Sequence, residues 1–213
     1  MVDLKSQYDK IKDTVNASIQ EVLDTTTYIN GPLVHEFQKD LEAYLDVKHV
    51  IPCANGTDAL QIAMMGLDLK PGDEVITVAC GFPTTINPII QAGCVPVFVD
   101  INTTLNIDTK NLDAAVTPKT KAVMIAHTLG NPFNMEEIRA LCDRHNLWLI
   151  EDCCDALGAT YNGQHVGTFG HMGTLSFYPA HHITMGEGGA VFTNKPRLRR
   201  VMESMRDWGR DCW

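Results

Sequence analysis

Short apolar runs, most of them rich in Val and Ile, alternate with amphipathic stretches along the chain. The predicted strands are 49–53, 74–79, 95–100, 121–127, 147–152, 173–179 and 189–194. Near-continuous apolar runs between helices are typical of strands that are buried on both faces. The sequence therefore predicts an α/β fold in which helices flank a mostly parallel sheet.

Amphipathic segments supply the predicted helices, near 57–67, 84–92, 134–145 and 196–207, with an N-terminal pair near 5–23 and 33–45. The last two strands follow each other without room for a crossover helix, so one of them is expected to run antiparallel. Ligands of such sheets bind at the carboxyl ends of the strands. Motifs at those ends are therefore the candidates for a functional site.

Composition narrows the class of protein. A net charge of −9 over 213 residues argues against nucleic-acid or membrane-surface binding as the main activity. The length suits one well-buried domain. No run has signal-peptide character or transmembrane length, and the seven cysteines are an odd number without regular spacing. These features predict a cytoplasmic protein with reduced thiols.

The stretch "ANGTDAL" lies at a strand end and a helix start. Gly56 permits a tight turn, and Thr57 and Asp58 are expected to cap the following helix. Exposed amides at that helix N-terminus suit a phosphate. Taken alone, the motif is better explained as a capped strand-to-helix turn.

Two further strand ends carry groups suited to a flat ring. Asp152 ends a very apolar strand, where it can cap a helix or pair with a protonated ring nitrogen of a bound heterocycle. Phe82, in "GFPTTINP", can stack on such a ring or pack in the core. Ser176 lies near the end of its strand, with His181 in the loop after it.

The order and spacing of "ANGTDAL", "GFPTT", "HTLGN", "IEDCCDALGA" and "SFYPAHHITMGEGGAV" resemble the DegT/DnrJ/EryC1/StrS family. Its members are vitamin B6-dependent enzymes of nucleotide-sugar metabolism with the fold-type I aminotransferase architecture. The resemblance implies a three-layer α/β/α large domain with a seven-stranded sheet across residues 1–213. It also implies an N-terminal helical arm of about 1–45, absence of the family's small C-terminal domain, and a homodimer.

The same resemblance implies roles for individual residues. Asp152 is expected to pair with the pyridine nitrogen of pyridoxal or pyridoxamine 5′-phosphate, and Phe82 to stack on its ring. Asp155 stands where many members have a glutamine near the ring hydroxyl. The residues expected to bind the cofactor phosphate are Gly56, Thr57, Asp58 and Ser176.

The family's cofactor-binding lysine falls at the position of His181, and residues 122–194 contain no lysine. Histidine exchanges protons near neutral pH but cannot hold the cofactor covalently. The expected cofactor is therefore pyridoxamine phosphate, bound without a covalent link.

Within the family, "PAHHITMGEGG", "IAHTLGN" and "DWGRDCW" resemble the branch of CDP-4-keto-6-deoxyglucose 3-dehydratases. That resemblance implies deoxygenation at C3 of a nucleotide-linked 4-keto-6-deoxy sugar, with a place in O-antigen and lipopolysaccharide biosynthesis. His181 would remove a proton from the cofactor methylene as the C3 hydroxyl leaves. Electrons would come from a separate reductase through a [2Fe–2S] cluster.

Cys154 and Cys212 fit two ligand positions of that cluster, and the chain stops at Trp213, where a further ligand is expected. The chain is thus expected to be a large domain truncated inside the cluster motif. Two alternatives stay open. "YINGPLVHEF" and "CANGTDALQIAM" resemble the amino-transferring branch, which predicts a sugar aminotransferase. The other alternative is a catalytically silent fragment or binding module.

Overall fold

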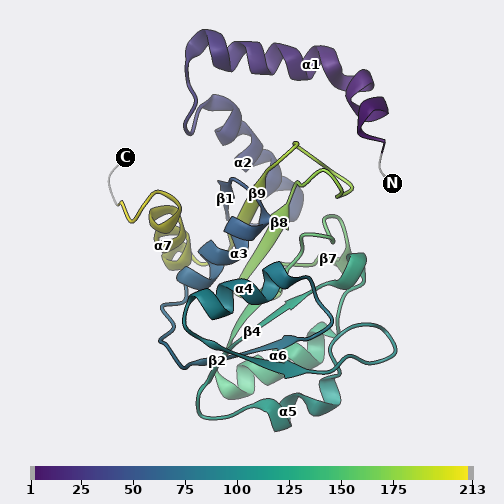
Figure 1. Ribbon diagram of the computed structural model, residues 1–213, viewed down its shortest axis with the longest axis vertical. Helices are drawn as coiled ribbons and strands as arrows, with labels where there is room; N and C mark the ends of the chain where they lie inside the picture. The colour runs from purple at the N-terminus through teal and green to yellow at the C-terminus, as the bar shows by residue number, and fades with distance from the viewer. Residues whose placement is uncertain (1–2, 211–213) are drawn as a thin grey trace.

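A seven-stranded sheet forms the centre of the computed structural model, which describes residues 3–210. The strand order is β1-β9-β8-β5-β4-β2-β3 (Figure 1). Strand β9 runs antiparallel to β1 and β8, and the other six strands share one direction, as predicted. The strands are β1 His49–Cys53, β2 Glu74–Val78, β3 Val95–Val99, β4 Thr120–Ala126, β5 Trp148–Asp152, β8 Met172–Ser176 and β9 Gly189–Thr193.

Helices cover both faces of this sheet, which gives the predicted three layers (Figure 1). Neighbouring residues of one strand pack into hydrophobic cores on opposite faces of the sheet. Met124 packs with α3 side chains, whereas Val123 packs with those of α6. On the first face lie α3 Gly56–Met65, α4 Pro83–Gln91 and α7 Pro196–Arg206; on the second lie α2 Pro32–Leu45, α5 Leu112–Ala115 and α6 Met135–His145. This alternation explains why the strands read as near-continuous apolar runs.

Helix α3 begins one residue earlier than predicted, which corrects the expected cap. The N-cap is Asn55, whose side chain accepts the Asp58 N–H at 2.8 Å. Thr57 and Asp58 lie inside the first turn, and Asn55 Nδ2 donates back to Asp58 Oδ2 at 3.3 Å. Asn55 therefore caps the helix, and its side-chain contact with Asp58 helps to fix the turn after β1.

Several small elements, including α5, were not predicted. A hairpin joins β6 Thr160–Tyr161 to β7 Gln164–His165 through Asn162 and Gly163, both at positive φ. A 3-10 turn, η1 Thr109–Asn111, precedes α5. A second short turn, η2 Thr128–Gly130, follows β4. None of these elements carries a long apolar run.

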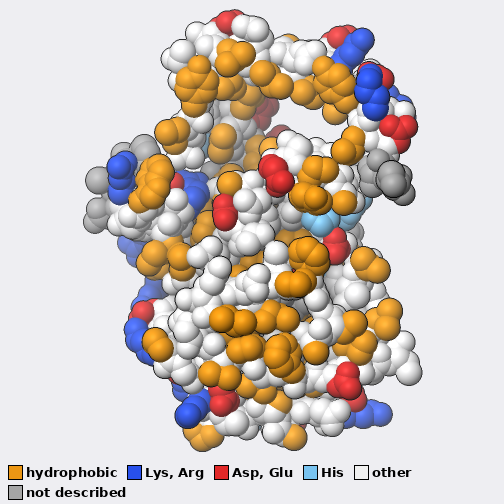
Figure 2. Space-filling view, viewed as in Figure 1, with side chains coloured by type: hydrophobic (Ala, Val, Ile, Leu, Met, Phe, Trp, Pro, Cys, Tyr) orange, Lys and Arg blue, Asp and Glu red, His pale blue; other side chains and the backbone are white. Residues whose placement is uncertain are grey.

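Helix α1 Leu4–Thr25 stands apart from the layered body (Figure 1) and has no buried residue. Its exposed apolar side chains include Leu4, Ile11, Ile19 and Leu23. Figure 2 shows hydrophobic side chains gathered along this helix. An isolated helix gains most of its stability by packing an apolar face, so α1 lacks its expected partner surface. Across residues 3–210, no helix is both long and apolar enough to cross a membrane, and the cytoplasmic location stays a prediction.

Candidate active site

The carboxyl ends of β1, β5 and β8 and the start of β9 meet at one edge of the sheet. Gly189 pairs with Cys53 on one side and with Ser176 on the other. A Cβ on Gly189 would lie 2.2 Å from the Asn55 carbonyl oxygen, so only glycine lets the turn after β1 lie against β9. The register thus brings the helix-start turn beside the end of β8.

Gly56 makes a second close approach at this edge. A Cβ there would lie 2.5 Å from Ser176 Cβ and 3.1 Å from Cys154 Sγ. The first turn of α3, the end of β8 and the segment after β5 therefore converge at one point. The first N–H groups of a helix have no partner within the helix, so this turn and the Ser176 hydroxyl together offer donors for an anion.

Asp152 is buried, with 5% of its surface exposed, and faces the same edge. Its Oδ2 accepts the Thr85 hydroxyl at 2.6 Å, and its Oδ1 accepts the Cys154 N–H at 3.1 Å. Thr85, which no sequence pattern singles out, lies in the first turn of α4, three residues after Phe82. Helix α4 therefore connects the predicted ring-binding carboxylate to the predicted ring-stacking aromatic.

Phe82 caps α4 with its side chain in solvent. The residue is 72% exposed, so packing in the core does not explain its position. An exposed aromatic at the mouth of a site is available to cover a flat ligand.

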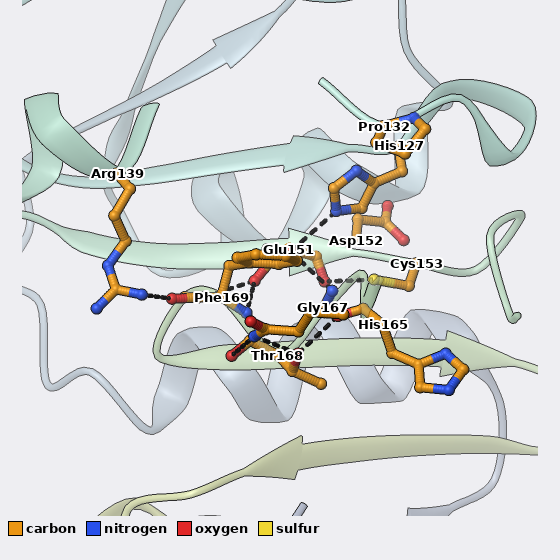
Figure 3. A network of polar contacts seen from close by, with 12 residues as sticks. His127, Pro132, Arg139, Glu151, Asp152, Cys153, His165, Gly167, Thr168 and Phe169 are labelled. Atoms are coloured by element: carbon orange, nitrogen blue, oxygen red, sulfur yellow. Dashed lines mark hydrogen bonds and ion pairs between the residues drawn. The ribbon is translucent and has the colours of Figure 1, made fainter. Parts of the chain in front are cut away.

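Glu151 precedes Asp152 but points to the other face of β5, where a polar network surrounds it (Figure 3). Its Oε2 contacts His127 Nε2 at 3.0 Å and accepts the Gly167 N–H at 2.7 Å. Its Oε1 accepts the N–H groups of Phe169 at 2.9 Å and Gly170 at 2.5 Å. No sequence pattern predicts this network, which ties β5 to two loops.

His181 lies beside Asp155. The distance from His181 Nδ1 to Asp155 Oδ1 is 2.8 Å, and the two side chains are 18% and 50% exposed. The adjacent His182 Nε2 contacts the Leu157 carbonyl oxygen at 2.7 Å. The loop after β8 is therefore fastened twice to the segment after β5.

The predicted cluster ligands are only partly described. Cys154 lies beside Gly56, and burial followed by the charge of Asp152 raises the pKa of its thiol well above the usual range. Cys212 lies outside the described residues. Within residues 3–210, no group of three or more His, Cys, Asp or Glu side chains can hold a metal ion. These residues alone do not make up an iron–sulfur site, and the six described cysteines are free thiols.

The residues at this edge do fit a phosphorylated pyridine. A side chain at position 56 would clash with Ser176. Because Gly56 has none, the backbone N–H donors of this turn stay open to a phosphate. The buried Asp152 carboxylate suits a ring nitrogen, and the exposed Phe82 suits the ring face. The residues suited to the phosphate, to the ring nitrogen and to the ring face therefore lie at one edge of the sheet.

The family model of the DegT/DnrJ/EryC1/StrS aminotransferase family matches residues 9–212. The chain belongs to this family. Its relatives include both enzymes that transfer an amino group to a sugar and enzymes that dehydrate one.

Two relatives illustrate the match. The lipopolysaccharide biosynthesis protein RfbH of Salmonella typhimurium is 60% identical over 93% of this chain and 46% of its own length. The dTDP-4-dehydro-2,6-dideoxy-D-glucose 3-dehydratase of Saccharopolyspora spinosa is 49% identical over 86% of this chain and 42% of its own length. The chain spans about half the length of the curated relatives it matches.

Solved structures confirm the fold-type I class. A family aminotransferase from Brucella abortus superposes with a TM-score of 0.90 at 36% identity, covering 95% of this chain and 57% of that one. The E. coli GDP-4-keto-6-deoxy-D-mannose-3-dehydratase with bound hydrated PLP gives 0.83 at 36% identity, covering 88% and 50%.

Proposed function

We propose that this protein is a pyridoxamine-phosphate-dependent 3-dehydratase of a CDP-linked 4-keto-6-deoxy sugar. The observation that carries the proposal is the contact of His181 with Asp155 at 2.8 Å, at the position where the family resemblance implies a lysine. The similarity to two named 3-dehydratases supports it.

The edge residues divide the work of holding the cofactor. The first turn of α3, at Gly56, Thr57 and Asp58, and the Ser176 hydroxyl would bind the phosphate, while Phe82 would cover the ring. Asp152 would keep the ring nitrogen protonated. When bound, pyridoxamine phosphate supplies an amine that condenses with the 4-keto group and a ring that accepts electron density.

His181 would perform the proton transfer. Its Nε2 would accept the proton released from the cofactor methylene carbon as the C3 hydroxyl departs. The imidazolium formed would then return that proton to the leaving hydroxyl, so that water is released. Histidine suits this exchange because both of its protonation states are accessible near neutral pH.

The remaining partners belong to the same proposal. A separate reductase would supply electrons, through a [2Fe–2S] cluster that includes Cys154 and Cys212 in the complete protein. No electron-transfer step is assigned to residues 3–210, which alone lack the ligand set. A homodimer would give α1 a partner for its exposed apolar side chains.

A sugar aminotransferase is the second candidate, supported by relatives that carry that name. The absence of a lysine at position 181 opposes it, because that group normally releases the product. A silent binding module is the third candidate, and the groups that gather at the active edge oppose it.

Product analysis with the purified complete protein separates the three candidates. The protein would be incubated with pyridoxamine phosphate, a CDP-4-keto-6-deoxyhexose and a chemical or enzymatic electron donor. Loss of the C3 hydroxyl supports the proposal. Formation of a new sugar amine from an amino donor would instead support the aminotransferase. A folded protein that does not bind pyridoxamine phosphate would support the silent module.

A further inference from the structure

The ring of His181 is held by a carboxylate from another part of the chain. His181 follows β8, and Asp155 follows β5. Asp155 Oδ1 lies 2.8 Å from His181 Nδ1, and the imidazole is only 18% exposed. The Tyr178 ring approaches the imidazole edge-on, with 6.0 Å between ring centres. The position of the ring is therefore defined on two sides.

A second contact keeps the carboxylate in place. His182 Nε2 lies 2.7 Å from the carbonyl oxygen of Leu157, two residues after Asp155. A carbonyl oxygen can only accept, so His182 donates. The His181 backbone N–H donates to the Tyr178 carbonyl at 3.0 Å, which closes the turn that presents both histidines. The Asp155 and His181 segments are thus joined independently of their own contact.

The Asp155 contact selects one form of the imidazole. An ionised carboxylate oxygen 2.8 Å from Nδ1 repels a nitrogen lone pair and attracts an N–H group, so the contact favours a proton on Nδ1. In the neutral ring the other nitrogen, Nε2, is then unprotonated. No hydrogen bond within residues 3–210 occupies Nε2. The geometry therefore prepares Nε2 as the base.

We propose that Asp155 is a positioning residue that fixes the tautomer and direction of His181, and not a ligand of the cofactor ring. The proposal rests on the proposed function for the identity of the reaction. It departs from the family pattern, in which this position is expected to face the ring hydroxyl.

The proton inventory is simple. Nε2 takes one proton, Nδ1 keeps its own, and the Asp155 carboxylate stays ionised and stabilises the positive ring. Returning the Nε2 proton to the departing hydroxide yields water and restores the neutral histidine. No oxidant or reductant takes part in these transfers.

The test begins with the complete protein in the absence of cofactor and substrate. Nitrogen-15 NMR distinguishes the two tautomers of a neutral imidazole, and the His181 signal is the one that disappears in His181→Asn. We expect the wild-type ring to carry its proton on Nδ1. In Asp155→Asn, the side-chain NH₂ can donate to Nδ1, so we expect a shift toward the Nε2-protonated form. An unchanged tautomer would overturn the proposal.

The holoenzyme supplies the second readout. We expect Asp155→Asn to lower turnover on the order of 10²-fold, because proton transfer by a positioned base is worth about 10²–10⁴-fold. The affinity for pyridoxamine phosphate, measured by calorimetry, should stay close to that of the wild type. Asp155→Glu, which keeps the charge, should recover part of the loss. A large fall in cofactor affinity with unchanged turnover of the loaded enzyme would assign Asp155 to the cofactor instead.

Asp113→Asn is the matched control. Asp113 also pairs with a histidine, His145 Nε2 at 3.3 Å, on an exposed surface away from the edge. The Asp113→Asn substitution should change neither the His181 signal nor turnover. The tautomer is measured without substrate, so it does not depend on the reaction. If the wild-type protein does not dehydrate sugars, the proposed function is wrong, but the test of the Asp155–His181 pair still holds.

Discussion

Glu151 and Asp152 are neighbouring carboxylates of β5 that point to opposite faces of the sheet and meet different surroundings. Glu151 is fully buried and receives four donors, from His127 and three backbone N–H groups. Asp152 receives two, from Thr85 and the Cys154 N–H. A carboxylate offers about four acceptor positions. Glu151 is therefore saturated, whereas about half of the acceptor positions of Asp152 stay open to a ligand.

The difference separates a structural face from a chemical one. Glu151 ties β5 to the loops at His127 and at 167–170, so its loss should cost stability (Figure 3). Asp152 lies on the edge shared with Ser176 and Gly56, so its loss should cost ligand binding.

The largest effect is expected from removal of the proposed base. His181→Asn should lower turnover of the complete enzyme by about 10²–10⁴-fold, because it removes general acid–base catalysis. The urea midpoint should change little, since the ring is partly exposed and its closest polar contact is Asp155. Product formation and urea unfolding, measured on the same preparation, check both statements. Undiminished turnover would remove His181 from the mechanism.

The next largest effect is expected at Glu151, on the structural face of β5. Glu151→Ala should lower the free energy of unfolding by about 3–5 kcal/mol, because it leaves several buried donors without an acceptor. Chemical denaturation measures the loss. Glu151→Gln, which retains one oxygen acceptor, should cost less and serves as the graded control. A loss below about 1 kcal/mol for Glu151→Ala, the net worth of a single hydrogen bond, would contradict the structural role.

A smaller effect is expected at the chemical face. Asp152→Asn should weaken pyridoxamine phosphate binding by about 10–100-fold, since a hydrogen bond to a charged group contributes roughly 1.5–3 kcal/mol. Calorimetric titration measures the affinity, and thermal unfolding without cofactor should shift much less. Asp143→Asn, on the exposed side of α6, is the control for removal of one charge. Equal affinity in the two variants would contradict the role of Asp152.

The smallest effect concerns the opposite end of β8 and β5. His171 Nδ1 accepts the Leu149 N–H at 3.0 Å, and burial, followed by the charges of Lys195 and Arg139, lowers the pKa of His171 to about 4. The unfolded chain, with an ordinary histidine pKa near 6.5, binds more protons between these values. The free energy of unfolding should therefore fall as pH drops from about 6.5 to about 4 and then level off.

His171→Asn, which keeps an acceptor, should remove this component, worth about 1–2 kcal/mol after allowance for the partial exposure of the ring. Urea unfolding at several pH values between these limits measures it. An identical pH dependence in the variant would show that His171 is not its source.

The strands and long helices could be predicted because their causes are local. Runs such as "KAVMIAH" are buried on both faces, and the absence of a helix between 179 and 189 forced the antiparallel direction of β9. The turn at Gly56 and the strand-end position of Asp152 were also visible in local sequence. The short hairpin was missed although Asn162-Gly163 is a strong turn signal, because its strands have two residues each.

The supporting contacts could not be predicted, because they join residues far apart in the chain. Thr85 lies 67 residues before Asp152, and His127 lies 24 residues before Glu151. No periodic pattern in the sequence indicates such long-range contacts. The Asp155–His181 contact has the same character: each residue stood out in sequence, but their meeting depends on the pairing of β5 with β8.

Hydrogen exchange at the methylene carbon of pyridoxamine phosphate tests the central claim most directly. The complete protein would be incubated with cofactor and the CDP-4-keto-6-deoxyhexose in deuterated water, and the cofactor then recovered for NMR. The account predicts stereospecific incorporation of deuterium by the wild type, loss of incorporation in His181→Asn, and intermediate rates in Asp155→Asn. Equal incorporation in all three proteins would contradict the assignment of His181 as the base.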